Sequence, residues 1–582
     1  MRYHALAVFL TCFLTCLLAG CGGSSGNGTF VNNLTPNGPE VQVPAGVSTG
    51  SVLLSTTLQP AAQGQQTVTH SSQVVPAEVT HFRTTAVDSD GALVFGPEVV
   101  VKAASVTFEG VPTTAVRFRI ELLTADEMVL GTFSQPITIR AQELIEVKNP
   151  TYTFIALVGE TGVTGPTGPQ GETGPKISRV SVASDGTQGD FQSLSPSISA
   201  DGRYIAFQAS ARNLVSGDTN GKQDVFVHDR QTSSTSRVSV ASDGTQGNDH
   251  SESASISADG RYIAFHSIAR NLVSGDTNGL PDIFVHDRDT STTSRVSVAS
   301  DGTQGDGSSL EPSISADGRY VVFHSHSTNL VSGDTNSNPD VFVHDRQTST
   351  TSRVSVASDG TQGNGLSQAS SLSADGRYVV FQSVANNLVL SDTNNNADIF
   401  VHDRQSLSTI LVSVASDGTQ GNSFSTTPSI SADGRYVSFG SNASNLVSGD
   451  TNDLTDVFVH DLQTSATTLV SVASDGTQGR DISQTSSISA DGRYVFFNSS
   501  ATNLVSGDTN GFTDVFVHDR QTSVTTLVSV ATDGTQGGGA SSGVFVSADG
   551  RYVAFHSEAT NFVSGDTNDA RDIFITRGPL AP

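Results

Sequence analysis

Short apolar runs alternate with polar, turn-rich segments along most of the chain, and after residue 178 this pattern becomes strictly periodic. The same arrangement returns every 58 residues, seven times, without insertion or deletion. Each copy contains a strand-like run such as Asp224–His228, in which Val225 and Val227 fall on one face. A fixed period of this length predicts repeated units that bury a shared core between neighbours.

Each repeat is expected to hold four short strands. In the first copy these are Ser197–Ser199, Tyr204–Phe207 and Asp224–His228, followed by Arg237–Val240 from the start of the next copy. The first two strands are joined by an Asp-Gly turn, which is a strong hairpin signal. Four-stranded units at a fixed period are typical of β-propeller blades.

The two ends of the repeat region complete each other. The region begins with a fourth strand at Arg179–Val182 and ends just after a third strand at Asp572–Ile575. Pairing these two pieces would close a ring by one-plus-three strand pairing, which an open array of repeats would not require. We therefore expect an all-β fold with a seven-bladed β-propeller over residues 177–582.

The repeat also resembles a known family. The run Ser-Ala-Asp-Gly-Arg-Tyr-Ile-Ala-Phe at 199–207, followed by Asp-Val-Phe-Val-His-Asp at 224–229, resembles the PD40, or WD40-like, repeat of TolB-type propellers. In that family the hairpin usually reads Ser-Pro-Asp-Gly, and here Ala200 takes the proline position. The resemblance implies the fold and not a function, because TolB has a different N-terminal domain and no lipid anchor.

Three different segments are expected before the repeats. Residues 41–156 contain short strand-like runs, and Val116–Leu122 alternates apolar and charged residues, so we expect a small β-sandwich of immunoglobulin or fibronectin type. Residues 159–176 carry Gly at every third position for six triplets and resemble bacterial collagen-like sequence. We interpret this short segment as an extended linker, and a trimeric stalk is the alternative.

The N-terminus predicts export and a lipid anchor. The apolar run Ala5–Leu18 follows Arg2 and is typical of a signal peptide over residues 1–20. Leu18-Ala19-Gly20-Cys21 resembles the lipobox of bacterial lipoproteins, which predicts lipidation of Cys21 and a flexible Gly/Ser/Asn-rich tether over residues 21–40. The alternative is an ordinary signal peptide that contains a cysteine. Gly22, in place of an inner-membrane retention Asp, favours the outer membrane in a Gram-negative source.

The net charge of the chain limits the classes of partner that it can be expected to bind. The formal net charge is -27, with 57 acidic and 30 basic side chains, so phosphate backbones would be repelled and nucleic-acid binding is not expected. All three cysteines lie within the first 21 residues, so no disulfide framework is expected in the repeats. The expected partners are the membrane, through the lipid on Cys21, and a protein or glycan.

A loop in each repeat suggests a calcium site. In the first copy, Ser216, Asp218, Asn220 and Asp224 occupy positions 1, 3, 5 and 9 with a glycine at position 6, close to the spacing of an EF-hand loop. An acid at position 1 and the glutamate at position 12 are missing. The alternative is that Asp and Asn cap turns through backbone amides, which the loss of the glycine in four copies favours. The candidate Ca²⁺ ligands are Ser216, Asp218, Asn220, Asp224, Asp276, Asn278, Asp282, Asp334, Asn336, Asp340, Asp508, Asn510 and Asp514.

Catalysis is not expected. The His-Asp pair that begins at His228-Asp229 recurs in six copies, whereas an active site is normally built once, so we interpret the pair as structural. The stretch before each first strand varies most between copies and should rim the central channel on the face that carries the long loops. The candidate ligand contacts are Phe191, His250, Glu252, Leu310, Glu311, Phe424 and Arg480. The alternative is drift in unconstrained loops.

The sequence therefore predicts a cell-envelope lipoprotein that displays a propeller for protein or glycan binding. A structural or adhesive surface protein with calcium-stabilised loops is the second interpretation. A propeller hydrolase or lyase is the third, and no acidic cluster unique to one repeat supports it.

Overall fold

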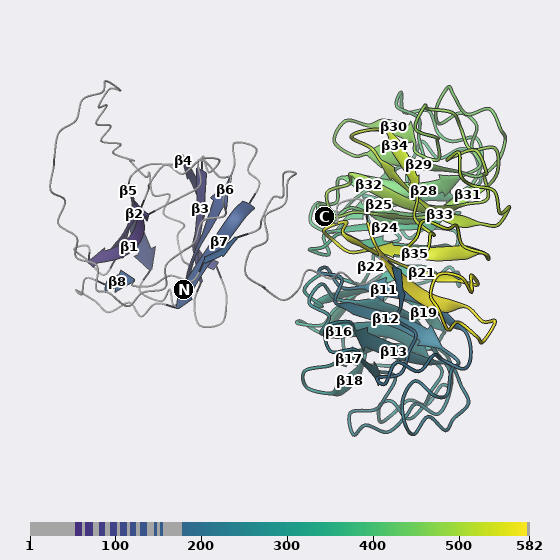
Figure 1. The fold of residues 1–582 in the computed structure, drawn as a ribbon, viewed down its shortest axis with the longest axis horizontal. Helices are drawn as coiled ribbons and strands as arrows, with labels where there is room; N and C mark the ends of the chain where they lie inside the picture. Colours follow the sequence, from purple (N-terminus) through teal and green to yellow (C-terminus); the bar gives the residue numbers. More distant parts are fainter. Residues whose placement is uncertain are drawn as a thin grey trace. The chain divides into compact units, whose positions relative to one another are not determined.

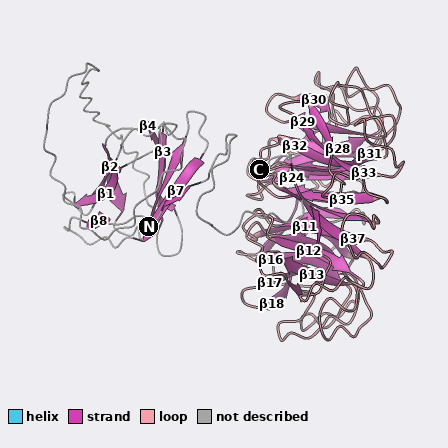
Figure 2. Cartoon of the chain, viewed as in Figure 1, coloured by secondary structure: helices cyan, strands magenta, loops and turns pink. Residues whose placement is uncertain are grey.

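The computed structural model describes the strands within residues 53–154 and the whole of residues 177–578. Every element in these residues is a β-strand, and none is a helix (Figure 2). Cys21, the tether at 21–40 and the collagen-like segment at 159–176 lie outside the described residues. In the part of the chain that the structure describes, no helix is long and apolar enough to cross a membrane.

The chain divides into two compact units, Met1–Gly168 and Pro169–Pro582. The first contains two antiparallel sheets, with strand orders β5-β2-β1-β8 and β4-β3-β6-β7-β9. Two antiparallel sheets are what the predicted sandwich requires. The strands are β1 (Leu53–Pro60), β2 (Gln65–Gln73), β3 (His81–Val87), β4 (Leu93–Val101), β5 (Ser105–Pro112), β6 (Arg117–Leu123), β7 (Val129–Pro136), β8 (Ile145–Val147) and β9 (Tyr152–Phe154).

The second unit consists of seven four-stranded antiparallel sheets, one for each blade. The first strands of blades 1 to 7 are β11 (Ser193–Ile198), β15 (Ser251–Ile256), β19 (Ser309–Ile314), β23 (Ser367–Leu372), β27 (Ser425–Ile430), β31 (Ser483–Ile488) and β35 (Ser541–Val546). The second strands are β12 (Tyr204–Ala209), β16 (Tyr262–Ser267), β20 (Tyr320–Ser325), β24 (Tyr378–Ser383), β28 (Tyr436–Ser441), β32 (Tyr494–Ser499) and β36 (Tyr552–Ser557).

The outer half of each blade is as regular as the inner half. The third strands are β13 (Asp224–Asp229), β17 (Asp282–Asp287), β21 (Asp340–Asp345), β25 (Asp398–Asp403), β29 (Asp456–Asp461), β33 (Asp514–Asp519) and β37 (Asp572–Arg577). The fourth strands are β14 (Ser234–Arg237), β18 (Thr292–Arg295), β22 (Thr350–Arg353), β26 (Ser408–Leu411), β30 (Ala466–Leu469), β34 (Val524–Leu527) and, in blade 7, β10 (Ile177–Arg179).

Strand β10 closes the ring, which confirms the one-plus-three prediction. It pairs antiparallel with β37, so the last sheet has the order β10-β37-β36-β35. The first strands of neighbouring blades contact one another around the whole ring, and β35 contacts β11. These two strands lie beside each other in Figure 1 although they come from opposite ends of the repeat region. The first strands therefore surround the propeller axis.

The core lies between blades. Val225 and Val227 of blade 1 pack in one cluster with Ile263 and Phe265 of blade 2, and every interface repeats this arrangement. Within each blade a phenylalanine pair adds to the packing, as in Phe207 and Phe226, whose ring centroids are 6.0 Å apart. Because a blade buries its faces only against its neighbours, the ring as a whole forms the stable unit.

The first and fourth strands differ from the sequence prediction. The first strand of blade 1 begins at Ser193, four residues before the predicted start, and contains a β-bulge between Leu194 and Ser197. Ser195 within this bulge has φ 50. The extra residue breaks the two-residue alternation by which a sequence predicts a strand, so the first strand extends into the variable stretch beyond its predicted start. The fourth strand ends at the arginine, and the following Val-Ser-Val belongs to a connection.

Candidate functional site

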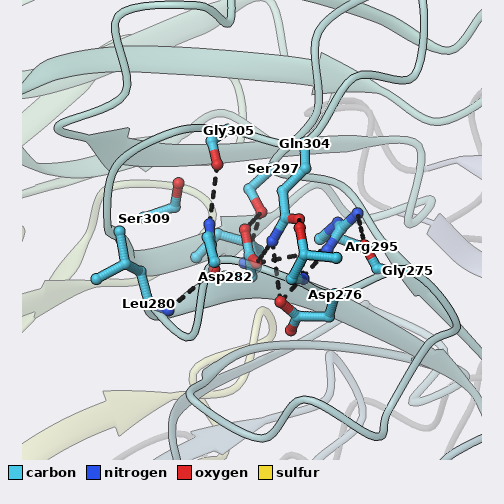
Figure 3. Close-up of polar contacts among 12 residues, drawn as sticks. Gly275, Asp276, Leu280, Asp282, Arg295, Ser297, Gln304, Gly305 and Ser309 are labelled. Carbon is cyan, nitrogen blue, oxygen red and sulfur yellow. Dashed lines mark hydrogen bonds and ion pairs between the residues drawn. The ribbon is translucent and has the colours of Figure 1, made fainter.

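The predicted calcium loop brings its two aspartates together. In blade 2, Asp276 and Asp282 both accept hydrogen bonds from Gln304 Nε2, at 2.9 and 2.8 Å (Figure 3). Asp282 is fully buried and also accepts a bond from Ser297 Oγ. Arg295 Nη1 lies 3.7 Å from Asp276 and 3.6 Å from Asp282. In this blade a guanidinium therefore occupies the position beside both carboxylates.

The remaining predicted ligands have other roles or positions. Asn278 donates to the Gly305 carbonyl and accepts from the Leu280 amide, so it caps the turn. Ser216 at position 1 is exposed, whereas the side chain of Asp218 is almost fully buried. The residue at position 6 has a positive φ in every blade, whether or not it is glycine: Gly221, Gly279, Ser337, Asn395, Asp453, Gly511 and Asp569. Loss of the glycine therefore leaves the shape of this turn unchanged.

The aspartate loops form two classes. An arginine reaches the two carboxylates in blades 1, 2, 3 and 7, through Arg237, Arg295, Arg353 and Arg179. In blades 4, 5 and 6 its place in the sequence is taken by Leu411, Leu469 and Leu527. We call the two classes arginine blades and leucine blades.

The leucine blades fold the same loop differently. In these blades the amide of the first aspartate donates to a valine carbonyl three residues earlier, as in Asp508 to Val505. Asp508 is 6% exposed, and its Oδ2 has no hydrogen-bond partner among the described residues. Burial raises the pKa of Asp398 in blade 4 to about 6, and the nearby Asp392 adds to this. A pair of buried carboxylates without the arginine is costly when both are charged.

The repeated His-Asp pair is part of the blade framework. His228 Nδ1 lies 2.8 Å from Thr235 Oγ1, and this hydroxyl donates to the Val182 carbonyl. Asp229 accepts two bonds from Arg203, at 2.9 and 2.8 Å. Both members of the pair are therefore engaged within the protein, in line with the structural interpretation.

A second set of residues differs between blades and gathers at one end of the channel. The second residue of each first strand pairs in register with the fifth residue of the second strand, next to the long loops. We call the two residues at these positions in each blade a mouth pair. They are Leu194–Gln208, Glu252–His266, Leu310–His324, Gln368–Gln382, Thr426–Gly440, Gln484–Asn498 and Ser542–His556. Opposite residues share one face of a sheet, so each pair is in side-chain contact range.

Blades 2 and 3 give this mouth an acidic, imidazole-containing sector. Glu252 Oε2 lies 3.8 Å from His266 Nε2, and Glu311 Oε2 lies 3.8 Å from His324 Nδ1. Burial lowers the pKa of both histidines to about 4, so they are neutral at pH 7. Two carboxylates therefore carry the charge of this sector.

Several buried polar atoms at the mouth have no hydrogen-bond partner within the described protein. They are Nδ1 of His266, His324 and His556, Oδ1 of Asn498, and Oγ of Ser193. Buried polar groups in native proteins are normally paired, with water if not with protein. Unpaired atoms at a channel mouth are available to water or to a ligand.

Blades 4 to 6 give the mouth an apolar sector. Phe424 and Ile482 immediately precede β27 and β31 and are 43% and 41% exposed. Val384 follows β24 and is equally exposed, and its amide donates to the carbonyl of Leu366, the residue before β23. Aligning the residue before each first strand would have identified Leu366 and Ile482, which the sequence prediction missed.

The predicted contact residues occupy three positions around this mouth. Glu252, Leu310 and Glu311 lie in first strands, where Glu311 is the bulge residue with φ 52. Phe191, His250 and Phe424 lie in the two residues before a first strand. Arg480 lies three residues before β31 and is exposed. The structure thus places all seven on the long-loop face, spread over blades 1, 2, 3, 5 and 6.

One mouth pair has the geometry of a nucleophile and a base. Ser542 Oγ lies 2.9 Å from His556 Nε2. Burial lowers the pKa of His556 to about 4, which makes it a weak base, and its Nδ1 lacks the orienting carboxylate that such a pair needs. No group of three or more His, Cys, Asp or Glu side chains within residues 177–578 is spaced to hold a metal ion.

Comparisons with known proteins find only solved structures of low similarity. No protein-family model and no curated protein matches the chain. A putative TolB from Agrobacterium tumefaciens is similar, with 13% identity, a TM-score of 0.33, and 61% of this chain and 98% of that chain covered. The extracellular domain of a putative hybrid two-component system from B. thetaiotaomicron has 9% identity, a TM-score of 0.35, and coverage of 93% and 59%.

A third solved structure is an enzyme. The GH43_1 enzyme from Xanthomonas citri, complexed with xylotriose, has 9% identity, a TM-score of 0.22, and 66% of this chain and 87% of that chain covered. At these values the propeller assignment rests on the strand pairing of the chain itself.

Proposed function

We propose that the protein is a cell-envelope lipoprotein that displays its propeller as a scaffold for binding a protein or a glycan at the channel mouth. The observation that carries this proposal is the distribution of differences between blades. The blade framework repeats almost residue for residue, while the mouth pairs and the residues before the first strands differ from blade to blade.

The chemistry of the mouth supports a binding role. The apolar sector of blades 4 to 6 and the carboxylates of blades 2 and 3 would contact apolar and polar parts of one ligand. Exposed apolar residues rimmed by polar ones are typical of interaction sites. Aromatic and aliphatic side chains beside carboxylates suit both a protein surface and the faces and hydroxyls of a sugar.

The binding proposal can be tested with matched variants. The detergent-solubilised full chain would be immobilised and probed with envelope extract and with a glycan array. The double variant Phe424→Ala/Ile482→Ala should lose the captured ligand. Phe512→Ala is the control, because Phe512 is 45% exposed but lies on an aspartate loop. Equal loss in both variants, or retention in the double variant, would argue against the mouth.

The anchor is proposed from the lipobox alone, with the outer membrane as its location. Cys21→Ser should abolish labelling by radioactive palmitate and release the protein from the membrane fraction. Persistent labelling of this variant would contradict the proposal.

A calcium-stabilised surface protein is the second candidate, and the leucine blades favour it. Their carboxylate pairs lack the arginine of the other four blades, and this is the observation that distinguishes them. Oδ2 of Asp508 has no hydrogen-bond partner among the described residues, and the same holds for Oδ2 of Asp276 in an arginine blade. A hard cation prefers such oxygen ligands. Calcium should raise the melting temperature relative to EDTA, and the variant Leu411→Arg/Leu469→Arg/Leu527→Arg should remove that difference. Equal melting temperatures of the parent with calcium and with EDTA would exclude calcium-stabilised loops.

A further inference from the structure

A tyrosine begins the second strand of every blade and, at five blade interfaces, is covered by an arginine of the following blade. The arginine Cζ lies 4.2 to 4.5 Å from the ring centroid. The five pairs are Arg230–Tyr552, Arg288–Tyr204, Arg346–Tyr262, Arg404–Tyr320 and Arg520–Tyr436. Each interface therefore contains a position that stacks a guanidinium on an aromatic face.

The same position also offers a hydrogen-bond acceptor. Arg404 Nη1 donates to the carbonyl of Gly376, the hairpin glycine of its own blade, at 2.6 Å. The other four arginines make the equivalent bond to Gly202, Gly260, Gly318 and Gly492. The tyrosine ring and the glycine carbonyl together define a guanidinium subsite.

At the interface of blades 4 and 5 this subsite lacks its arginine. Leu462 occupies the arginine position and faces Tyr378, and Gly434 is the hairpin glycine. The backbone is unchanged, since the Leu462 amide donates to the Arg435 carbonyl as the Arg404 amide does to Arg377. The shorter side chain leaves an open cavity of about 330 Å³, lined among others by Tyr378, Gly434, Leu462 and Ile410.

The charged residues around the cavity have counterparts of the same type around the Arg404 guanidinium at the neighbouring interface. Asp403, Asp433 and Arg435 line it, and Arg377 holds Asp403 in two hydrogen bonds. At the Arg404 interface the corresponding residues are Asp345, Asp375, Arg377 and Arg319. The same arrangement of charges therefore accommodates a guanidinium at the neighbouring interface.

The surface beside the cavity carries two apolar side chains at positions that are polar in blades 1, 2, 3, 5 and 6. Leu407 is 62% exposed with φ 60, where blades 1, 2, 3, 5 and 6 have serine. Ile410 is 44% exposed, where those blades have serine or threonine. A leucine in the left-handed region is strained and here exposes apolar surface, a combination that marks functional sites. The arginine is also missing at the interface of blades 6 and 7, where Gly578 stands at its position, but Leu462, Ile410 and Leu407, which precedes the lining residue Ser408, occur together only at the interface of blades 4 and 5.

We propose that the cavity between blades 4 and 5 binds an arginine side chain of a partner protein, with Leu407 and Ile410 forming the apolar rim of that interface. The guanidinium would lie over Tyr378 and donate to the Gly434 carbonyl, as the chain's own arginines do at the five sister positions. Arginine anchors in a pocket with an apolar surround are typical of interface hot spots. This site is separate from the channel mouth, because the hairpins lie at the opposite ends of the strands from the long loops.

The test measures binding of a defined probe to the full chain. Nα-acetyl-arginine methylamide should bind with a stoichiometry of one in calorimetry, and the isosteric neutral citrulline compound should bind at least about tenfold more weakly. Leu462→Arg restores the residue of the sister blades and should abolish binding, as should Leu462→Phe, which fills the cavity by another route.

The outcomes separate this site from the mouth. The Phe424→Ala/Ile482→Ala variant should bind the arginine probe like the parent, so failure of either site leaves the other testable. Unchanged probe binding in folded Leu462→Arg and Leu462→Phe, or equal binding of arginine and citrulline, would overturn the proposal.

Discussion

His228 illustrates how the repeat uses side chains that are catalytic in many enzymes. Its ring is buried, and because the Thr235 hydroxyl already donates to the Val182 carbonyl, it accepts the proton on His228 Nδ1. Burial lowers the pKa of His228 to about 4. The neutral ring is therefore part of the packing, and charging it opposes the fold.

This histidine predicts a pH dependence of stability. A histidine whose folded pKa lies below its unfolded value stabilises the fold above about pH 6.5 and loses that contribution as the pH falls toward 4. His228→Gln keeps a polar group but cannot titrate, so lowering the pH from 7 to 5 should cost this variant roughly 2 kcal/mol less than the parent. Denaturant unfolding at both pH values measures the difference, and identical pH dependence in the two proteins would contradict it.

At the residue level the sequence predicted the convergence of Asp218 and Asp224 but not their partners. Spacing within one loop was enough to bring the two carboxylates together. Gln246 and Arg237 come from later in the chain, and no local pattern links them to the loop. The pairs of Glu252 with His266 and Glu311 with His324 depend on strand register across a bulge, which spacing cannot supply.

The bulge in each first strand is the element that was hardest to predict from the sequence. Six blades place a residue other than glycine at its left-handed position, and blade 7 has Gly543, with φ 64. Left-handed serine, threonine or alanine gives no turn signal of the kind that Gly or Asn gives. The hairpins were predicted correctly because the dipeptide Asp-Gly is a strong indicator of a hairpin turn.

Gly543 allows a sharp test of this element. A Cβ there would lie 2.4 Å from His556 Cε1, so Gly543→Ala should destabilise the protein by about 1–3 kcal/mol. Ala369→Gly at the same position of blade 4 is the matched control and should stay within about 1 kcal/mol of the parent. Chemical denaturation compares the two, and an equally stable Gly543→Ala would show that the bulge has freedom to move.

For the whole molecule, the phase of the repeats was the most informative feature of the sequence. It predicted a closed ring, and β10 pairs with β37 as that phase requires. A repeated sequence predicts the architecture well, because every copy indicates the same strands. A binding site can be predicted only from the small differences between copies. The ligand's identity is absent from both, since it depends on how seven separate loops meet in space.

Because β10 closes the ring, a residue at the start of the repeat region should contribute to the stability of the last blade. Ile177 is fully buried in a cluster with Phe555 and Phe574 of blade 7. Ile177→Ala should therefore cost about 2–4 kcal/mol, although its neighbours lie almost 400 residues away. Ser178→Ala in the same strand should change stability by less than about 0.5 kcal/mol. Similar melting temperatures for the two variants would show that the ring does not depend on this strand.

A ligand site at the channel mouth requires that ligand binding protects the mouth and leaves the propeller core unchanged. Hydrogen exchange of the full chain, with and without the ligand captured from envelope extract, tests it most directly. New protection is expected in residues 248–254, 308–311, 422–426 and 480–484, with the blade cores unchanged. Protection confined to the outer strands, or none in these four segments, would contradict it.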